Sequence, residues 1–471
     1  MRPQKVILFA LMVVLAGCSL NPAYERPVLP TAGAYPDVNV TATPAALSVE
    51  RLPWREFFTD PGLQKVILQV LENNRDLRMA VAKIREARAV YGIQRADLLP
   101  NLGAGAFYSR SRTPADLSLI GRPLTLEQYE VSLDLSVWEL DFWGRVRSLT
   151  QAALESYLAT EAARRAATVS LIAQAANTYL IARELDERTS IARWTVALRE
   201  DSWRIARRRY EVGAASRLDA AQAETLLNQA RADLAALRRL RDLNRNALVL
   251  LTGTPSIEAE DRELSELEQG FPGDIAPGLP SALLVNRPDI LAAEHRLKAA
   301  HAEIGAARAA FFPNIALTGS LGTASAELSG LFGSGSGIWS FVPSLTVPIF
   351  QGGRLRANLD LAEARRNLAV AEYERTVQDA FREVADALAE RRWLGNQTAA
   401  LRATLEHFPP WNGWRPCAPT SPTGASRWCV TMAITVMSRG VNGKQKERTM
   451  SFPAFSILWK TIKRSGKTGR G

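Results

Sequence analysis

The sequence predicts a mostly α-helical chain with a smaller β portion that suits a membrane, built as an internal duplication. Residues 281–322 repeat residues 76–101 at a constant offset of 213. In both copies a long helical pattern ends at a proline, Pro100 or Pro313, and changes into an alternation of period two. Proline fixes φ and lacks an N–H, so it ends a helix and begins an extended segment. Other matched pairs are Asp76 with Asp289, Gly92 with Gly305, and Arg95 with Arg308.

The net charge of +10 belongs to one end of the chain. Residues 407–471 hold 11 Lys and Arg against one acid, whereas the first 406 residues balance 47 basic and 47 acidic side chains. A basic face is the usual mark of nucleic-acid binding. Because the body of the chain is neutral, we expect no nucleic-acid partner.

The N-terminus predicts export and lipid attachment. Residues 1–17 are predicted to be a signal peptide, because basic residues precede an apolar run too short to span a bilayer. The run ends in L-A-G-C at residues 15–18, which resembles the lipobox of bacterial lipoproteins and makes Cys18 the expected lipid-attachment residue. An ordinary signal peptide with an incidental cysteine is the alternative. Ser19 replaces the aspartate that favours inner-membrane retention in lipoproteins, so the outer membrane is expected.

Proline-free stretches predict long helices after an extended lipid-anchored leash at residues 18–61. The first helix runs from Leu63 to Leu99, about 55 Å. A second runs from Arg145 to Tyr210, turns near Gly213, where Ser216 can cap the next helix, and returns as Leu218 to Leu251. A last helix runs from Arg354 to Glu406. The central pair predicts a long helical hairpin, with a coiled-coil spacer as the alternative.

The segments after each proline predict two strand pairs. In the first, one side is apolar and the other polar, as in a strand between lipid and water, although a soluble half-buried strand has the same pattern. The apolar positions are Val131, Leu133, Leu135 and Val137, flanked by Tyr129 and Trp138, and the polar positions are Glu130, Ser132, Asp134 and Ser136. In the second pair, a Gly/Ser loop at 329–337 joins two strands with similar apolar sides. Glycine turns at Gly144 and Gly353 lead from each pair into the next helix.

Four strands are too few to close a barrel in lipid, where an open edge leaves backbone groups without partners. Either the strands form a soluble sheet, or several copies of the chain share one barrel. The export signal and the long flanking helices favour sharing.

Several segments together resemble the TolC-like outer-membrane efflux channels, in their lipoprotein branch, over residues 18 to about 406. These segments are the L-A-G-C lipobox, VWELDFWGRVR at 137–147, RYEVGAASRLDAAQAE at 209–224, GLPSALLVNRPDILAAE at 278–294 and ARAAFFPNIALTGS at 307–320. The resemblance implies a homotrimer whose protomers each give four strands to a shared 12-stranded outer-membrane barrel, with the helices forming a periplasmic tube. A smaller mixed region would draw on residues 252–280 and the leash.

The resemblance also implies function and partners. The chain would be the passive outer-membrane channel of a tripartite efflux system that exports drugs or other small molecules, joined by a periplasmic adaptor to an inner-membrane pump. The lumen would be lined by Glu130, Ser132, Asp134 and Ser136, and Tyr129 and Trp138 would be girdle aromatics, unless they are plain packing residues. The tip that meets the adaptor would comprise Val212, Gly213, Ser216, Leu218 and Asp219, unless this turn only links the helices.

Along the chain, the first structural repeat is expected at 62–280 and the second, truncated, at 281–406. Residues 407–471 depart from the family, which continues with a second hairpin and a returning helix. They contain six prolines and the surplus positive charge, which indicates a reading-frame change, with a divergent genuine tail as the alternative.

No catalytic pattern emerges from the sequence. It contains no P-loop, HExxH or GxSxG, and His295 and His301 are six residues apart, out of phase with helical metal-ligand spacing. We therefore expect no enzymatic activity, cofactor or metal. The alternatives to a small-molecule channel are a protein-secretion channel, a non-conducting envelope rod, and a non-functional copy.

Overall fold

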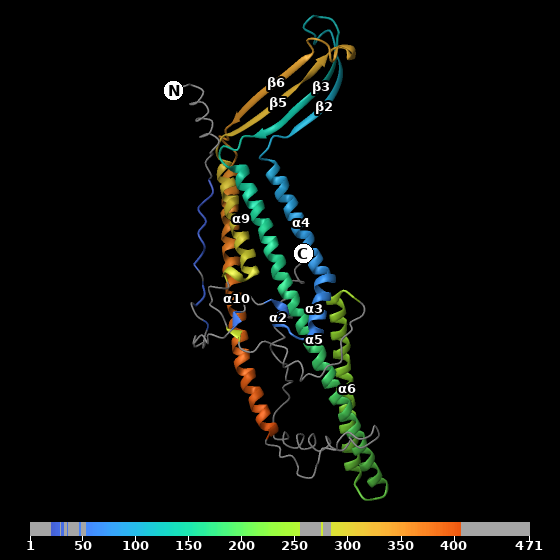
Figure 1. Cartoon of the computed structure of the whole chain (residues 1–471). Coiled ribbons are helices and arrows are strands. Elements are labelled where there is room, and N and C mark those ends of the chain that lie inside the picture. The colour runs from blue at the N-terminus through green and yellow to red at the C-terminus, as the bar shows by residue number, and fades with distance from the viewer. Residues whose placement is uncertain are drawn as a thin grey trace. The chain divides into compact units, whose positions relative to one another are not determined.

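A computed structural model describes residues 20–28, 30–32, 35, 47–48, 53–254, 275–276 and 284–406. The described chain is mostly helical and contains a four-stranded sheet (Figure 1), which confirms the predicted composition of the fold. It divides into two units. The first holds the sheet and its adjoining helices, up to residue 177 and then from 248 to 381, and the second holds residues 178–247 and the helical residues after 381.

The predicted first helix is interrupted, so the expectation of one continuous helix from Leu63 to Leu99 was wrong. After the short α2 (Trp54–Phe57), α3 (Pro61–Asn73) ends and α4 (Arg75–Ala96) begins on either side of Asn74, whose ψ is 133°. The Asn74 side chain accepts a bond from the Leu77 N–H at 3.1 Å and donates one to the Leu251 carbonyl at 3.0 Å. Asn74 thus caps α4 and is held by Leu251, so the helix breaks here although the sequence pattern is helical throughout.

The sheet joins both predicted hairpins. Its order is β2 (Leu102–Thr113), β3 (Leu124–Glu139), β5 (Asn314–Ser325) and β6 (Gly337–Thr346), and every pairing is antiparallel. The 3-10 turn η3 (Leu328–Gly330) lies near the start of the predicted Gly/Ser loop. Since β3 pairs with β5, the two repeats meet at the centre of the sheet, and β2 and β6 are its edges.

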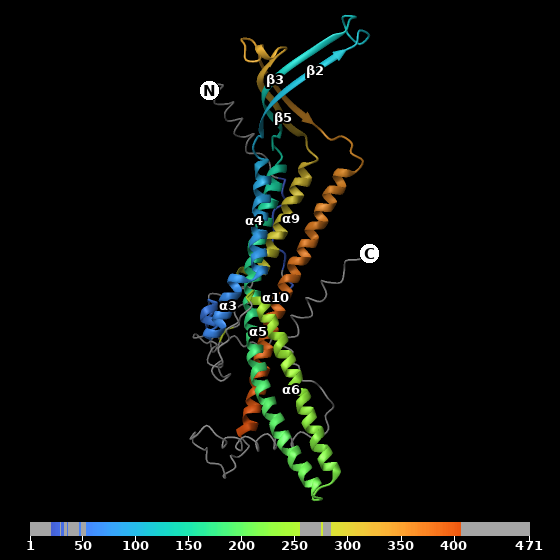
Figure 2. The same cartoon turned by 90° about the vertical axis from the view of Figure 1, so that its right-hand side faces the viewer.

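The long helices follow the predicted bounds closely. They are α5 (Arg145–Glu211), α6 (Arg217–Thr252), α9 (Pro288–Ala309) and α10 (Arg354–Glu406). In the first unit the order across the molecule is α4, α5, α9, α10, which repeats the strand order (Figure 2). Within the described ranges, none of the helices has both the length and the apolar content needed to cross a bilayer.

A buried apolar cluster of the first unit lies between α9 and α10. Ile290 and Leu297 on α9 and Tyr373 on α10 are fully buried, and Val377 packs with them. Each such side chain contributes on the order of 1.5–3 kcal/mol by leaving water. The core therefore holds the second repeat's helix pair together.

A two-residue parallel ladder joins distant segments of the first unit. β1 (Leu47–Ser48) pairs with β4 (Ile275–Ala276). One residue pair of the predicted leash thus pairs with one of the 252–280 linker. Residues 36–46, 49–52, 255–274 and 277–283 lie outside the described part of the chain.

Candidate functional site

The sheet has one continuous apolar face. Leu133 of β3 lies opposite Ala104 of β2 and Leu321 of β5, and Leu321 lies opposite Trp339 of β6. Because alternate residues of a strand share a face, the same side also carries Leu102, Val131, Leu135, Ile315, Leu317, Phe341 and Leu345. Leu133, Leu321, Trp339, Phe341 and Leu345 are exposed to solvent in the single chain. An apolar surface of this extent needs a cover.

The opposite face of the sheet, called the polar face below, carries the polar side chains of β3, together with the exposed Phe107 of β2 and Val342 of β6. Glu130, Ser132 and Asp134 lie on it, as the alternation predicts, and the Ser132 hydroxyl donates to Asp134 Oδ2 at 2.9 Å. On the second hairpin the hydroxyls of Ser320 and Ser340 lie 2.6 Å apart on the same side. The structure thus brings three of the four predicted lumen residues to one polar surface.

The fourth, Ser136, lies in a β-bulge that the sequence pattern did not reveal. The register between β3 and β5 shifts between Leu135 and Trp138, so Ser136 and Val137 are outside the paired ladder. The extra residue puts Trp138 on the apolar face and Glu139 on the polar face, because they pair with Leu317 and Ala316. Strict alternation would have placed them the other way round.

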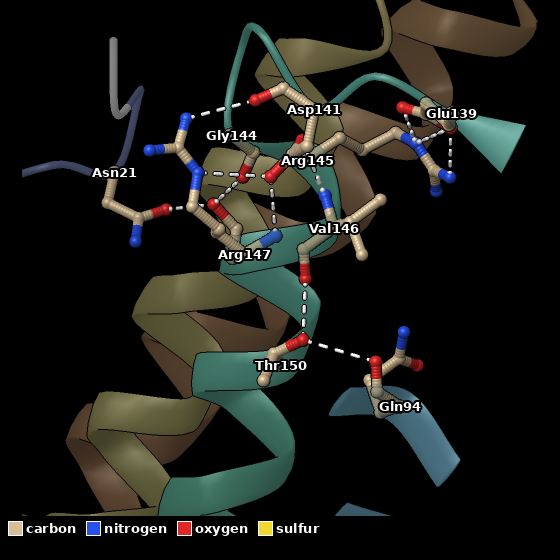
Figure 3. Close-up of polar contacts among 10 residues, drawn as sticks. Asn21, Gln94, Glu139, Asp141, Gly144, Arg145, Val146, Arg147 and Thr150 are labelled. Carbon is tan, nitrogen blue, oxygen red and sulfur yellow. Dashed lines mark hydrogen bonds and ion pairs between the residues drawn. The ribbon is translucent and has the colours of Figure 1, made fainter. Parts of the chain in front are cut away.

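The turn from β3 into α5 is built by its own side chains (Figure 3). Gly144 has φ of 75°, a left-handed conformation that favours glycine. Asp141 accepts bonds from the N–H groups of Val146 and Arg147 at 2.9 and 2.8 Å, which caps α5. Arg145 forms a bidentate pair with Glu139 at 2.6 to 3.1 Å.

The same turn contacts the helix–strand junction of the second repeat. The Trp143 indole N–H donates to the Pro313 carbonyl at 2.8 Å, and its ring stacks on Phe312 at 4.7 Å between centroids. Pro100 and Pro313 each lie four residues beyond the end of a helix, α4 at Ala96 and α9 at Ala309, and Gly353, with φ of 83°, forms the second glycine turn. Each of the four residues, Gly144 included, lies between a helix and a strand.

The second unit ends in the predicted hairpin tip. Gly213 has φ of 75°, and Ser216 and Asp219 form a capping box: the Asp219 N–H donates to the Ser216 hydroxyl, and the Ser216 N–H donates to the Asp219 carboxylate, both at 3.1 Å. Hydrogen bonds from the Ser216 side chain and backbone lower the pKa of the Asp219 carboxyl. Val212 and Leu218 are both exposed. The tip is thus a turn with a hydrogen-bonded cap and two apolar side chains exposed to solvent.

The N-terminal segment forms a site that the sequence pattern did not predict. The described residues of the predicted leash pack against α9 and α10: Arg26 forms a bidentate pair with Glu294 at 2.9 Å, and Tyr35 stacks on Phe381 at 5.0 Å. A glutamate inside the apolar pattern of α9 was the available signal. Cys18 lies outside the described residues, so its lipid attachment remains a prediction.

The histidines have separate local partners. His295 Nδ1 lies 2.7 Å from Glu155 of α5, and His301 packs edge-on against Tyr24. Through these contacts His295 and His301 take part in the packing of the first unit.

Comparison with known proteins gives a consistent result. The profile of a family described as "Outer membrane efflux protein" matches residues 66–254 and 279–408. Outer membrane protein OprJ of Pseudomonas aeruginosa is 49% identical over 83% of this chain and 81% of its own length. The solvent efflux pump outer membrane protein SrpC of Pseudomonas putida is 43% identical over 87% of each. The open state of the Neisseria gonorrhoeae MtrE outer membrane channel is 42% identical, with a TM-score of 0.73 over 83% of this chain and 86% of that one.

Proposed function

This chain belongs to the outer membrane efflux protein family, and from that membership we propose how it builds its conduit. It is the outer-membrane channel of a tripartite efflux system, and it extends into the periplasm. In our proposal, three copies each contribute the four strands to one 12-stranded barrel, and their helices continue as a passive periplasmic tube. The observation that carries this proposal is the pair of open sheet edges, β2 and β6.

Those edges need partners in a membrane. An unpaired strand edge in lipid leaves each backbone N–H and C=O unsatisfied, at several kcal/mol per group. Within one chain the second strand of the first repeat, β3, pairs with the first strand of the second, β5. The duplication therefore favours the equivalent pairing between copies, with β6 of one copy beside β2 of the next.

The helices of the first unit support the same arrangement. One face of α9 packs on α5, where His295 meets Glu155, and the alanines of that face are buried, with Ala306 only 8% exposed. At the offset of 213, Ala306 corresponds to Ile93 of α4, which is 70% exposed. The α4 face that corresponds to a buried α9 face thus has no cover within the described chain.

A matching face is uncovered on α10. Ala159 of α5, on the side that meets α9, is 3% exposed. Aligning Gly144 with Gly353 makes Leu368 its counterpart on α10, and Leu368 is 61% exposed. Packing α10 of one copy on α4 of the next would bury both apolar faces, just as α5 and α9 bury theirs.

We place the apolar face of the sheet against lipid and the polar face toward the lumen. Glu130, Ser132 and Asp134 would then give the pore a wet, acidic wall, and Tyr129 and Trp138 would lie on the lipid side. SrpC is named for solvent efflux. We propose small apolar or amphiphilic molecules as cargo, which need a polar conduit because they would otherwise partition into the membrane.

The remaining partners are proposed from the hairpin tip and from the N-terminal segment. We propose that the hairpin tip, with Val212, Gly213, Ser216, Leu218 and Asp219, meets a periplasmic adaptor that links the channel to an inner-membrane pump. The exposed Val212 and Leu218 support this role. We also propose that Cys18 carries a lipid anchored in the outer membrane.

The shared barrel predicts a definite register between copies, which cysteine cross-linking tests. Leu135 lies opposite Gly319 in the β3–β5 ladder. Gly319 corresponds to Ala106, and Leu135 corresponds to Leu345 once the extra residue of the bulge is counted. Opposed residues of antiparallel strands lie within disulfide range, so Ala106→Cys with Leu345→Cys should link each copy to the next.

The experiment uses a chain with Cys417→Ser and Cys429→Ser, oxidised in outer membranes and run on a non-reducing denaturing gel. We expect a ladder that stops at three copies. Arg110→Cys with Leu345→Cys, four residues out of register, is the matched control and should link far less. Equal linking by both pairs, or a ladder that continues beyond three, would contradict the shared barrel.

A further inference from the structure

The N-terminal segment 20–28 is held on the α9–α10 pair by specific contacts. Its central partner is Glu294, whose side chain is only 5% exposed. Both carboxylate oxygens accept bonds from Arg26 at 2.9 Å, and the Tyr24 hydroxyl donates to Oε1 at 3.2 Å. Lys298 Nζ lies 3.4 Å from the same oxygen. A buried carboxylate is tolerated only with partners of this kind.

The electrostatics match this geometry. Burial alone would raise the pKa of the Glu294 carboxyl, but the hydrogen bond from Arg26 and the charge of Lys298 lower it below its ordinary value. Glu294 is therefore charged near neutral pH, and Arg26 neutralises it from the segment.

A second contact lies one helical turn from the β3–α5 junction. The Ser148 hydroxyl of α5 donates to Asn21 Oδ1 at 2.8 Å (Figure 3). A Cβ at Gly305 of α9 would lie 1.6 Å from that oxygen and 3.0 Å from the Asn21 Cα. The absent side chain at Gly305 thus makes room for Asn21.

The segment runs alongside α9 between these two contacts. Asn21 lies at Gly305 and Arg26 at Glu294, so five residues of segment run alongside eleven residues of helix. Five extended residues span at most about 18 Å, and eleven helical residues rise about 16 Å. The segment can therefore cover this length of α9 as an extended chain, and the Arg26 side chain spans part of the distance.

We propose that residues 20–28 form a strap, held by Glu294, that fixes this N-terminal segment at the helix–strand junction. Glu294 is a positioning residue in this account. The strap itself does not depend on the proposed trimer or cargo. Its use rests on the proposed function, since it would hold a lipid-bearing N-terminus at the level where the sheet enters the membrane.

Hydrogen exchange of the amides of residues 20–28, in the full chain in membranes, tests the lock. Glu294→Gln keeps the size of the side chain and removes its charge. We expect exchange to be about tenfold faster or more, because hydrogen bonds to charged groups correspond to at least that factor. Glu303→Gln is the matched control: this acid lies on the same helix and pairs with Arg365 at 3.7 Å, away from the strap, and should leave the exchange unchanged.

Two further variants keep the proposal falsifiable. If Glu294→Gln disturbs α9, Arg26→Gln releases the lock from the segment's side and should speed exchange equally. Cys18→Ser should leave the strap's exchange unchanged, because Glu294 holds it. The proposal would be overturned if neither Glu294→Gln nor Arg26→Gln speeds exchange of the strap amides. It would also be overturned if Cys18→Ser speeds their exchange as much as these two variants do. Failure of the inter-copy cross-link would leave the strap proposal unaffected.

Discussion

Helices α4 and α9 are copies of one another that differ most in their surroundings. Twelve residues of α9 are buried and none of α4 is. The glycines at the same place in each copy show the difference in one residue: Gly305 lies against Asn21, and Gly92 has nothing within 4 Å of a built Cβ. The duplication thus repeats the elements but not their neighbours. The second repeat's helix packs against residues 20–28 and a buried cluster, whereas the corresponding face of the first repeat's helix is exposed.

The end of the second repeat offers the largest test of this comparison. In the second unit, α6 returns beside the later part of α5, with Asn244 bonded to the Thr178 carbonyl at 3.0 Å and Arg241 paired with Asp186. Among the described residues no helix returns beside α10, which leaves most of its last turns exposed. The apolar face of a helix stays exposed to solvent when no neighbouring helix packs against it.

We predict that replacing residues 407–471 with a second hairpin and returning helix, copied from 209–251, greatly increases the yield of stable trimer. The added helix would cover the stripe of α10 that includes Val384 and Leu388. Trimer on a non-denaturing gel and dye efflux in a channel-deficient strain are the measurements. Equal trimer and equal efflux from the 471-residue form would refute the frame-change hypothesis.

The two faces of the sheet give the next largest effect. Leu133→Arg places a cation on the proposed lipid face and should cost roughly 2–4 kcal/mol near the bilayer midplane. Ser132→Arg, one residue away on the polar face, should fold normally and change single-channel conductance instead. Trimer yield and conductance of both variants are compared in the same membranes. If both substitutions lower the yield alike, the assignment of the faces is wrong.

The sequence predicted the long helices because proline-free runs with helical spacing need no distant information. It also predicted the two-sided strands, since Leu133 and Asp134 alternate locally. It missed the helix break at Asn74, because the bond to the Leu251 carbonyl joins residues far apart in the chain. It missed the bulge after Leu135 for the same reason: only pairing with β5 reveals the extra residue.

The strap was missed because its two halves are unremarkable alone. Arg26 lies in a proline-rich segment, and Glu294 is one charge within a helix. Only the fold brings them to 2.9 Å. The hairpin tip could be predicted, because Ser216 and Asp219 cap their own helix and lie three residues apart in the sequence.

The paired glycines provide the smallest and most controlled test. Alanine is favoured over glycine inside a helix by roughly 1 kcal/mol, so Gly92→Ala should stabilise the chain by up to about that amount. Gly305→Ala gains the same helical preference, but its Cβ would meet Asn21, whose side chain and backbone must both shift. We therefore expect Gly305→Ala to lose this gain and to speed hydrogen exchange in residues 20–28. Chemical unfolding and exchange of both variants, measured side by side, check this.

If Gly305→Ala were stabilising and left the strap protected, the contrast between the surroundings of α4 and α9 would not hold at this position. If Gly92→Ala instead lowered trimer yield without destabilising the single chain, the open face of α4 would be in close contact with a neighbouring copy.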